Sequence, residues 1–315
     1  MTWQRVPHAL QGLLPVGALL LSATMWGVLW YPLRLLETAG LAGLWSSLVI
    51  YGAALLAGLP VLWRFRRGLR AQGVPQRRLL VLLALASGWT NIAFILAVLE
   101  GNVVRVMLLF FLSPLWTVLL ARLLLAERLN RAARLTVLLA LSGSLTMLWE
   151  PGLGLPWPRD GADWLALSSG FAFALSNVLV RRLQAVPVPL KAVVAWWGVV
   201  GLAFLLILAG GVPVPAVAFP VWGAAALIGM LGIVVMTLAV VYGVTHMPAH
   251  RSAVILLFEL VAGAASAQWL TDEVVQPREW LGGALIVAAA WFSARASLNT
   301  PRKEKKRAAK EVGDA

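Results

Sequence analysis

Ten apolar runs, each about the length needed to cross a membrane, constrain the fold of this chain more than any other feature. A transmembrane helix needs about 20 mainly apolar residues, and a soluble domain rarely repeats such runs. With 61% apolar and 12% charged residues, the composition is that of an all-α membrane protein. The runs cover residues 13–34, 42–63, 79–99, 104–125, 133–149, 161–181, 191–210, 219–243, 251–271 and 278–296.

Lys and Arg residues are distributed unevenly between the connections of these runs. If the N-terminus is cytoplasmic, 21 of the 26 basic residues lie inside, four lie outside, and Arg122 lies within a run. Positive charge in short connections marks the cytoplasmic side. We therefore expect a multi-pass protein of the cytoplasmic (inner) membrane with both termini in the cytoplasm. The net charge of +13 is then loop charge, and no nucleic-acid partner is predicted.

A shift of 146 residues aligns the first five runs with the last five. It pairs Arg105 with Arg251, Glu127 with Glu273, Ser22 with Ser168, and Gly52 with Gly198. Because five is odd, two such repeats must cross the membrane in opposite directions. The connection ERLNRAAR after the fourth run is basic, whereas its counterpart DEVVQPREW is not, as inverted repeats require.

The sequence thus predicts ten transmembrane helices arranged as two inverted five-helix repeats around a central cavity. The predicted parts are a cytoplasmic N-terminus (1–12), a first repeat (13–149), a connecting loop (150–160), a second repeat (161–296) and a basic, disordered cytoplasmic tail (297–315). Inverted repeats generally place a substrate site near the midplane, at their interface.

Glu259 is the ionisable residue predicted to lie deepest in the membrane. Charged groups at this depth are costly and therefore candidates for function. Two interpretations are open: a protonatable or cation-binding group on a transport path, or a structural carboxyl bonded to a neighbouring helix. On one uninterrupted helix it would share a face with Ser252, Leu256, Gly263 and Ser266.

Other polar and aromatic residues fall in the middle of the runs. Pro114 frees a backbone carbonyl four residues earlier and predicts a kink. Hydroxyl and amide groups could line a cavity or simply serve helix packing, and a deep Trp could bind a flat or cationic substrate or fill space. These candidate lining residues are Ser22, Trp26, Asn91, Phe94, Ser113, Phe173 and Asn177.

The repeated Arg–Glu pairs Arg105/Glu127 and Arg251/Glu273 are candidate gate or loop pairs, although both arginines could instead extend toward lipid headgroups. His246 and His250 have a metal-binding spacing, but Pro248 lies between them, so no metal is predicted. Without Cys, a phosphate-binding Gly loop or a nucleophile–base pair, the chain is expected to be no enzyme and to need no cofactor.

Three segments carry a resemblance to a known family: SATMWG (Ser22–Gly27), FFLSPLWTVLLARLLLAERL (Phe110–Leu129) and LFELVAGAASAQWLTDE (Leu257–Glu273). In their order, spacing and duplication they resemble the EamA-like ten-helix branch of the drug/metabolite transporter superfamily. Glu259 fills the Glu of a Glu-Pro pair, and Leu260 replaces the Pro, which weakens the case for a kink there. The resemblance implies a cavity lined mainly by helices one, three, four, six, eight and nine, and secondary transport of small metabolites.

The leading hypothesis is a secondary active transporter of an amino-acid-like or drug-like metabolite. It would export by proton antiport with alternating access, and Glu259 would be the coupling or substrate-binding acid. The alternatives are a substrate/substrate exchanger without ion coupling, an intramembrane enzyme, and a non-transporting sensor or scaffold. The expected partners are a small-molecule substrate, the lipid bilayer and protons, with monomer or homodimer left open.

Overall fold

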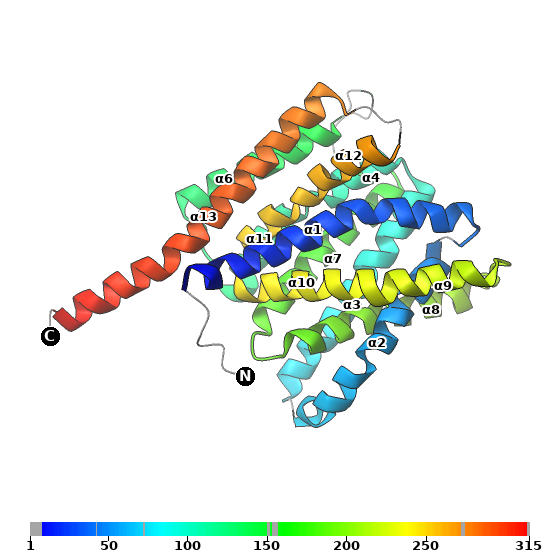
Figure 1. Cartoon of the computed structure of the whole chain (residues 1–315), viewed down its shortest axis with the longest axis horizontal. Coiled ribbons are helices and arrows are strands. Elements are labelled where there is room, and N and C mark those ends of the chain that lie inside the picture. The colour runs from blue at the N-terminus through cyan, green and yellow to red at the C-terminus, as the bar shows by residue number, and fades with distance from the viewer. Residues whose placement is uncertain are drawn as a thin grey trace.

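The structure is a computed structural model that describes residues 8–41, 43–71, 73–149, 152, 157–271 and 275–313, and over these it is a bundle of helices (Figure 1). The first half contains α1 (His8–Thr38), α2 (Gly43–Ala71), α3 (Val74–Glu100), α4 (Val103–Phe110), α5 (Ser113–Leu125) and α6 (Arg131–Leu148). The second half contains α7 (Gly161–Arg182), α8 (Val188–Gly210), α9 (Phe219–Leu227), the π-helical segment η3 (Ile228–Ile233), α10 (Val234–His246), α11 (Ala249–Leu256), α12 (Phe258–Leu270) and α13 (Pro277–Gly313).

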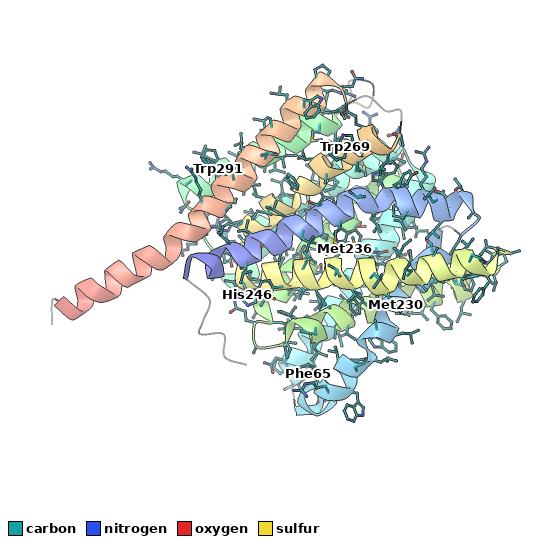
Figure 2. All side chains as sticks on the ribbon, in the orientation of Figure 1. Phe65, Met230, Met236, His246, Trp269 and Trp291 are labelled. Carbon is teal, nitrogen blue, oxygen red and sulfur yellow. The ribbon has the colours of Figure 1, made fainter. Side chains whose placement is uncertain are left out.

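The helices reproduce the predicted apolar runs. Among the described residues, nine segments are long and apolar enough to cross a membrane, and the tenth predicted run lies in α13. The outer surface is apolar as well: Trp269, labelled in Figure 2, and Phe219 are each 85% exposed. Such a surface suits a hydrocarbon environment, so the chain is a multi-pass integral membrane protein.

The two halves pack against each other with an approximate twofold relation. Helix α1 contacts α10 and α12, and its counterpart α7 contacts α3 and α5. The equivalent helices α2 and α8 pack together, as do α6 and α13, which lie side by side in Figure 1. The predicted fold, two five-helix repeats of opposite orientation, is confirmed.

One hydrogen bond occurs in both halves and makes this relation concrete. The Ser22 hydroxyl on α1 donates to the Met236 carbonyl at 3.0 Å, and the Ser169 hydroxyl on α7 donates to the Thr90 carbonyl at 2.6 Å. Met236 follows Thr90 by the predicted 146 residues, but Ser169 follows Ser22 by 147, so the counterpart of Ser22 in this contact is Ser169 and not the predicted Ser168. The repeat therefore extends from the sequence to individual contacts between helices.

The fourth span of each repeat is broken near its middle. Helix α4 ends at Phe110, four residues before Pro114, as the missing proline N–H predicts. The kink that Leu260 made doubtful in the second repeat is also present, since α11 ends at Leu256 and α12 begins at Phe258. There the Leu260 N–H donates to the Leu257 carbonyl at 3.1 Å, so a tightened turn breaks the helix without proline.

The charged tail differs from the prediction. Residues from 297 onward were predicted to be disordered, whereas the backbone of α13 continues as helix to Gly313 and runs past the end of the bundle (Figure 1). The tail sequence is rich in Lys, Arg, Ala and Glu, which are strong helix formers. High charge excluded burial of this segment but not helix formation.

Candidate functional site

The two broken spans meet in the centre of the bundle. Phe110 and Phe111, at the break between α4 and α5, share one buried cluster with Leu257 and Leu260 at the break between α11 and α12. Phe94 from α3 and Phe173 from α7 contact Phe110, with ring centroids 5.0 Å and 5.5 Å away. The structure therefore brings the predicted residues Phe94 and Phe173 together through Phe110, which the sequence reasoning missed as a lining candidate.

Glu259 lies in the first turn of α12, directly after the second break. It is half-buried, and its carboxyl group makes no hydrogen bond or ion pair with any residue that the structure describes. The N-terminal turn of a helix presents free N–H groups and favours negative charge. The break thus places a carboxyl without a counter-charge, among the described residues, at the start of a half-helix.

Helix α1 fixes the backbone beside Glu259. A Cβ atom on Gly27 would lie 2.6 Å from the Glu259 carbonyl oxygen, so only glycine permits this approach. Two turns further along α12, the Ser266 hydroxyl donates to the Gly27 carbonyl at 3.1 Å and accepts the Trp30 indole N–H at 2.9 Å. The face predicted for span nine is interrupted at Leu257, and its part in α12 packs on α1.

Two of the remaining lining candidates, Asn91 and Ser22, make side-chain hydrogen bonds to other helices. The Asn91 amide donates to the Tyr51 hydroxyl at 2.6 Å, a partner that sequence reasoning missed. Ser22 is fully buried and holds α1 against α10, so its hydroxyl serves helix packing. Ser113 is buried at the start of α5, while Trp26 on α1 and Asn177 on α7 are half-buried.

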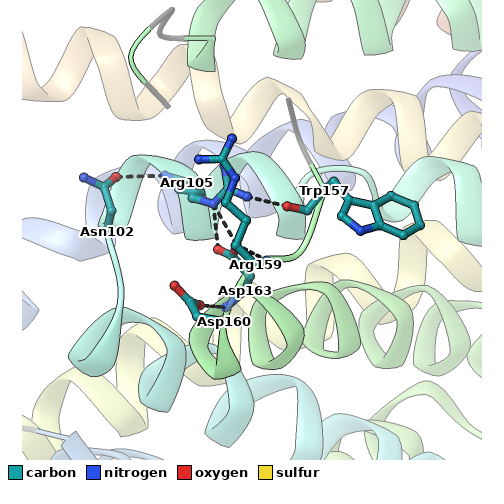
Figure 3. A network of polar contacts seen from close by, with 6 residues as sticks. All are labelled: Asn102, Arg105, Trp157, Arg159, Asp160 and Asp163. Carbon is teal, nitrogen blue, oxygen red and sulfur yellow. Dashed lines mark hydrogen bonds and ion pairs between the residues drawn. The ribbon is translucent and has the colours of Figure 1, made fainter. Parts of the chain in front are cut away.

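Arg105 is held in a buried polar network that we call the Arg105 cluster (Figure 3). Its Nε lies 2.7 Å from Asp163 Oδ2, and its Nη2 donates to the Trp157 carbonyl at 2.5 Å. Asp163 also accepts the Arg159 N–H, and the Asp160 side chain caps α7 by accepting the Asp163 N–H. Arg105 is only 6% exposed, so it is an ion-pair residue that joins α4 to α7 rather than one that extends toward headgroups.

Glu127 forms a second network, the Glu127 cluster, at the opposite end of the same helices. Its Oε1 lies 3.5 Å from Arg181 Nε on α7, and its Oε2 accepts the Ala249 N–H at 3.0 Å. His250 Nδ1 lies 3.8 Å from the same Oε2. Burial alone would raise the pKa of Glu127, but the hydrogen bond from the Ala249 N–H, the nearby His250 ring and the charge of Arg181 outweigh it and lower the pKa. Glu127 is therefore a carboxylate at neutral pH.

Lys191 adds a fully buried ammonium group beside this cluster. Its Nζ donates to Thr245 Oγ1 at 2.6 Å and to the carbonyls of Val180 and Leu183 at the end of α7. The sequence reasoning counted Lys191 only as a loop charge. Arg251 follows His250 on α11 and interacts with Glu127, whereas Glu273, the predicted partner of the second pair, lies outside the described residues.

Among the described residues, no three His, Asp or Glu side chains come together as a metal site would require. The candidate residues are therefore the Glu259 carboxyl at the second break and the phenylalanine rings at the first. The two clusters of charged residues lie toward the ends of the helices.

Comparison with known proteins assigns the family. The model of the EamA-like transporter family matches residues 13–149 and again residues 161–295. The chain belongs to the EamA-like transporter family. The predicted resemblance to the drug/metabolite transporter superfamily is thereby confirmed.

Two relatives and one solved structure show how far the similarity of this EamA-like protein extends. It is 29% identical over 193 residues to an uncharacterized transporter of Pseudomonas aeruginosa, PA0485, covering 60% of this chain and 61% of the relative. It is 37% identical over 108 residues to Protein RarD of Salmonella typhi, covering 34% of each chain. A solved structure matches with a TM-score of 0.68 at 16% identity, covering 89% of this chain and 97% of the other, and supports the fold alone.

Proposed function

We propose that this EamA-like protein is a secondary active transporter that exports a small organic metabolite in exchange for protons. The observation that carries the proposal is Glu259, a half-buried carboxyl without a hydrogen-bond partner among the described residues, at the break of a membrane span. Such a group can bind either a proton or a polar substrate group. Ionisable residues at this depth commonly mark proton and substrate pathways.

The architecture supports alternating access around this carboxyl. Broken helices at the interface of inverted repeats are typical of secondary transporters, whose repeats rock around a central site. Here both breaks occur, and the phenylalanine cluster of Phe94, Phe110 and Phe173 adjoins the first of them. We propose that the rings and Glu259 face a common cavity and bind an amino-acid-like or drug-like molecule.

The orientation and location follow from the distribution of positive charge. We propose that the protein resides in the cytoplasmic membrane with both termini in the cytoplasm, because 21 of 26 basic residues then lie inside. The Glu127 cluster would be at the cytoplasmic end and the Arg105 cluster at the outer end. Export would then begin on the side of the Glu127 cluster.

The proposal is tested by two measurements on purified protein. A thermal-shift screen at two pH values, against amino acids, polyamines, sugars, nucleosides and aromatic cations, identifies a stabilising ligand. Counterflow of that ligand in proteoliposomes is then measured across a range of pH. We expect Glu259→Gln to retain folding and abolish the pH dependence of counterflow, because the amide cannot exchange a proton.

Glu37→Gln is the matched control, because Glu37 is exposed at the end of α1. It is expected to behave as wild type. If counterflow by Glu259→Gln keeps the pH dependence of wild type, proton coupling through Glu259 is wrong. If wild type itself exchanges substrate without responding to an imposed pH gradient, the protein is an exchanger.

A further inference from the structure

His250 is a buried histidine that no step of the proposed transport cycle uses. It lies in the first turn of α11, its side chain is 12% exposed, and its Nδ1 has no hydrogen-bond partner among the described residues. A buried ring nitrogen without a partner is unfavourable, so such a group calls for an explanation. Histidine changes its charge between about pH 5 and 8.

The nearest acceptor for this nitrogen is the Glu127 carboxylate. Oε2 of Glu127 lies 3.8 Å from His250 Nδ1, which is beyond a hydrogen bond but within the range of an ion pair. The same carboxylate accepts the Ala249 N–H and faces Arg181 at the looser distance of 3.5 Å. A small rotation of either side chain would close the gap once the ring carries a proton.

We propose that His250 is a second proton-binding site, separate from Glu259, whose protonation ties the start of α11 to the end of α5 through Glu127. A charged imidazole donating to a carboxylate forms a charge-assisted hydrogen bond, which is stronger than a neutral one. Arg181 would lose part of its hold on Glu127 but would keep its bond to the Thr245 carbonyl at 2.6 Å. The carboxylate already accepts the Ala249 N–H of α11 at 3.0 Å, so protonation adds a second bond to α11 and weakens the contact with α7.

Several cations lie at the same end of the bundle as the Glu127 cluster. Arg181 and Lys191 come from α7 and α8, Arg251 follows His250 on α11, and Arg182 donates to the Leu124 carbonyl. Glu127 is the carboxylate that the described residues place against His250. A proton on His250 would therefore face Glu127, which links it to the position of α11.

The consequence follows from the place of α11 in the fold. Its far end is the break that precedes Glu259, and its start lies at the end of the bundle assigned to the cytoplasm. Fixing the start of α11 to α5 holds this end closed. Acidification of the cytoplasmic side would therefore slow the opening of this end of the bundle. This expectation rests on the proposed orientation but not on proton coupling through Glu259.

The test uses the absence of cysteine from the chain, because a single introduced thiol is then the only one. Ser252, 1% exposed and one turn inside the start of α11, is replaced by Cys, and its alkylation by N-ethylmaleimide reports opening of this end. The rate is measured with and without His250→Gln at pH 7.5 and pH 5.5. The ratio of the two rates at each pH cancels the pH dependence of the thiol itself.

We expect the alkylation rate of His250→Gln to equal that of the parent at pH 7.5. At pH 5.5 the variant should react about tenfold faster than the parent, which corresponds to the weakest charge-assisted hydrogen bonds. His246→Gln is the matched control. His246, labelled in Figure 2, is exposed, and the bond that the described residues give it is to the Tyr242 carbonyl within α10, so its ratio should stay near one at both pH values.

Glu127→Gln should remove the pH effect in the same way as His250→Gln. The effect should persist in a Glu259→Gln background, which separates this inference from the proposed transport mechanism. A His250→Gln ratio that is equal at the two pH values, or a pH effect that survives Glu127→Gln, overturns the proposal.

Discussion

Two equivalent helix contacts in this molecule are held together by different chemistry. Helix α7 packs against α4 and α5, and by the pseudo-twofold relation α1 packs against α11 and α12. The α7 contact carries an ion pair at each end, Arg105–Asp163 and Arg181–Glu127. Over the described residues, the polar contacts of α1 with α12 are the neutral bonds from Trp30 to Ser266 and from Ser266 to Gly27.

The difference indicates which contact is easier to separate. A buried ion pair is costly to break, because each charge would remain in a low dielectric without its partner. Neutral hydrogen bonds between membrane helices contribute about 0.6 kcal/mol on average. Glu259 lies at the neutral contact. The group that we propose to couple transport to protons is therefore at the contact that needs less free energy to separate.

The largest effect is expected at the charged contact. Asp163→Asn removes the carboxylate from the buried Arg105 and should lower the free energy of unfolding by about 3–5 kcal/mol. Thermal and denaturant unfolding of the detergent-solubilised protein measures the loss. Asp160→Asn on the same turn is the control, because Asn caps a helix as well as Asp does. Equal stability of the two variants would show that the ion pair does not hold α7.

A smaller effect is expected at the neutral contact. Gly27→Ala places a Cβ atom 2.6 Å from the Glu259 carbonyl oxygen, so α12 must move away from α1. Such overpacking costs about 1–3 kcal/mol, and we expect it to change the pH dependence of transport because it displaces Glu259. Gly17→Ala on the same helix meets nothing within 4 Å and should be neutral or slightly stabilising. If Gly27→Ala matches Gly17→Ala in both respects, the close contact with α12 does not position Glu259.

The sequence predicted the architecture more fully than it predicted individual contacts between side chains. Apolar runs and the repeat predicted the spans and their pairing, because a membrane leaves few alternatives. The break at Phe110 followed from Pro114, but the break at Leu257 did not, since a tightened turn has no residue type of its own. Periodicity along one span also could not show that the face containing Glu259 is interrupted.

The ion-pair partners were out of reach for a related reason. Asp163 lies 58 residues after Arg105, and only the packing of α4 on α7 makes them neighbours. The available signal was weak: an acidic residue in the first turn of a span, at the same predicted end of the bundle as Arg105. For Lys191, charge alone suggested a loop, whereas the carbonyl groups at the end of α7 provide buried acceptors.

The smallest effect tests whether the two halves are equivalent in energy as well as in geometry. Ser22→Ala and Ser169→Ala each remove one bond from a first helix of a repeat to a main-chain carbonyl, Met236 in one case and Thr90 in the other. Both serines are fully buried, so each variant should lose about 0.6 kcal/mol of unfolding free energy, and the two losses should agree. Unequal losses would show that the two repeats differ in energy at these serine bonds as well as at the ion pairs. Equal losses would restrict the asymmetry to the ion pairs. The easier separation of the α1 contact would then be due to the absence there of pairs such as Arg105–Asp163 and Arg181–Glu127.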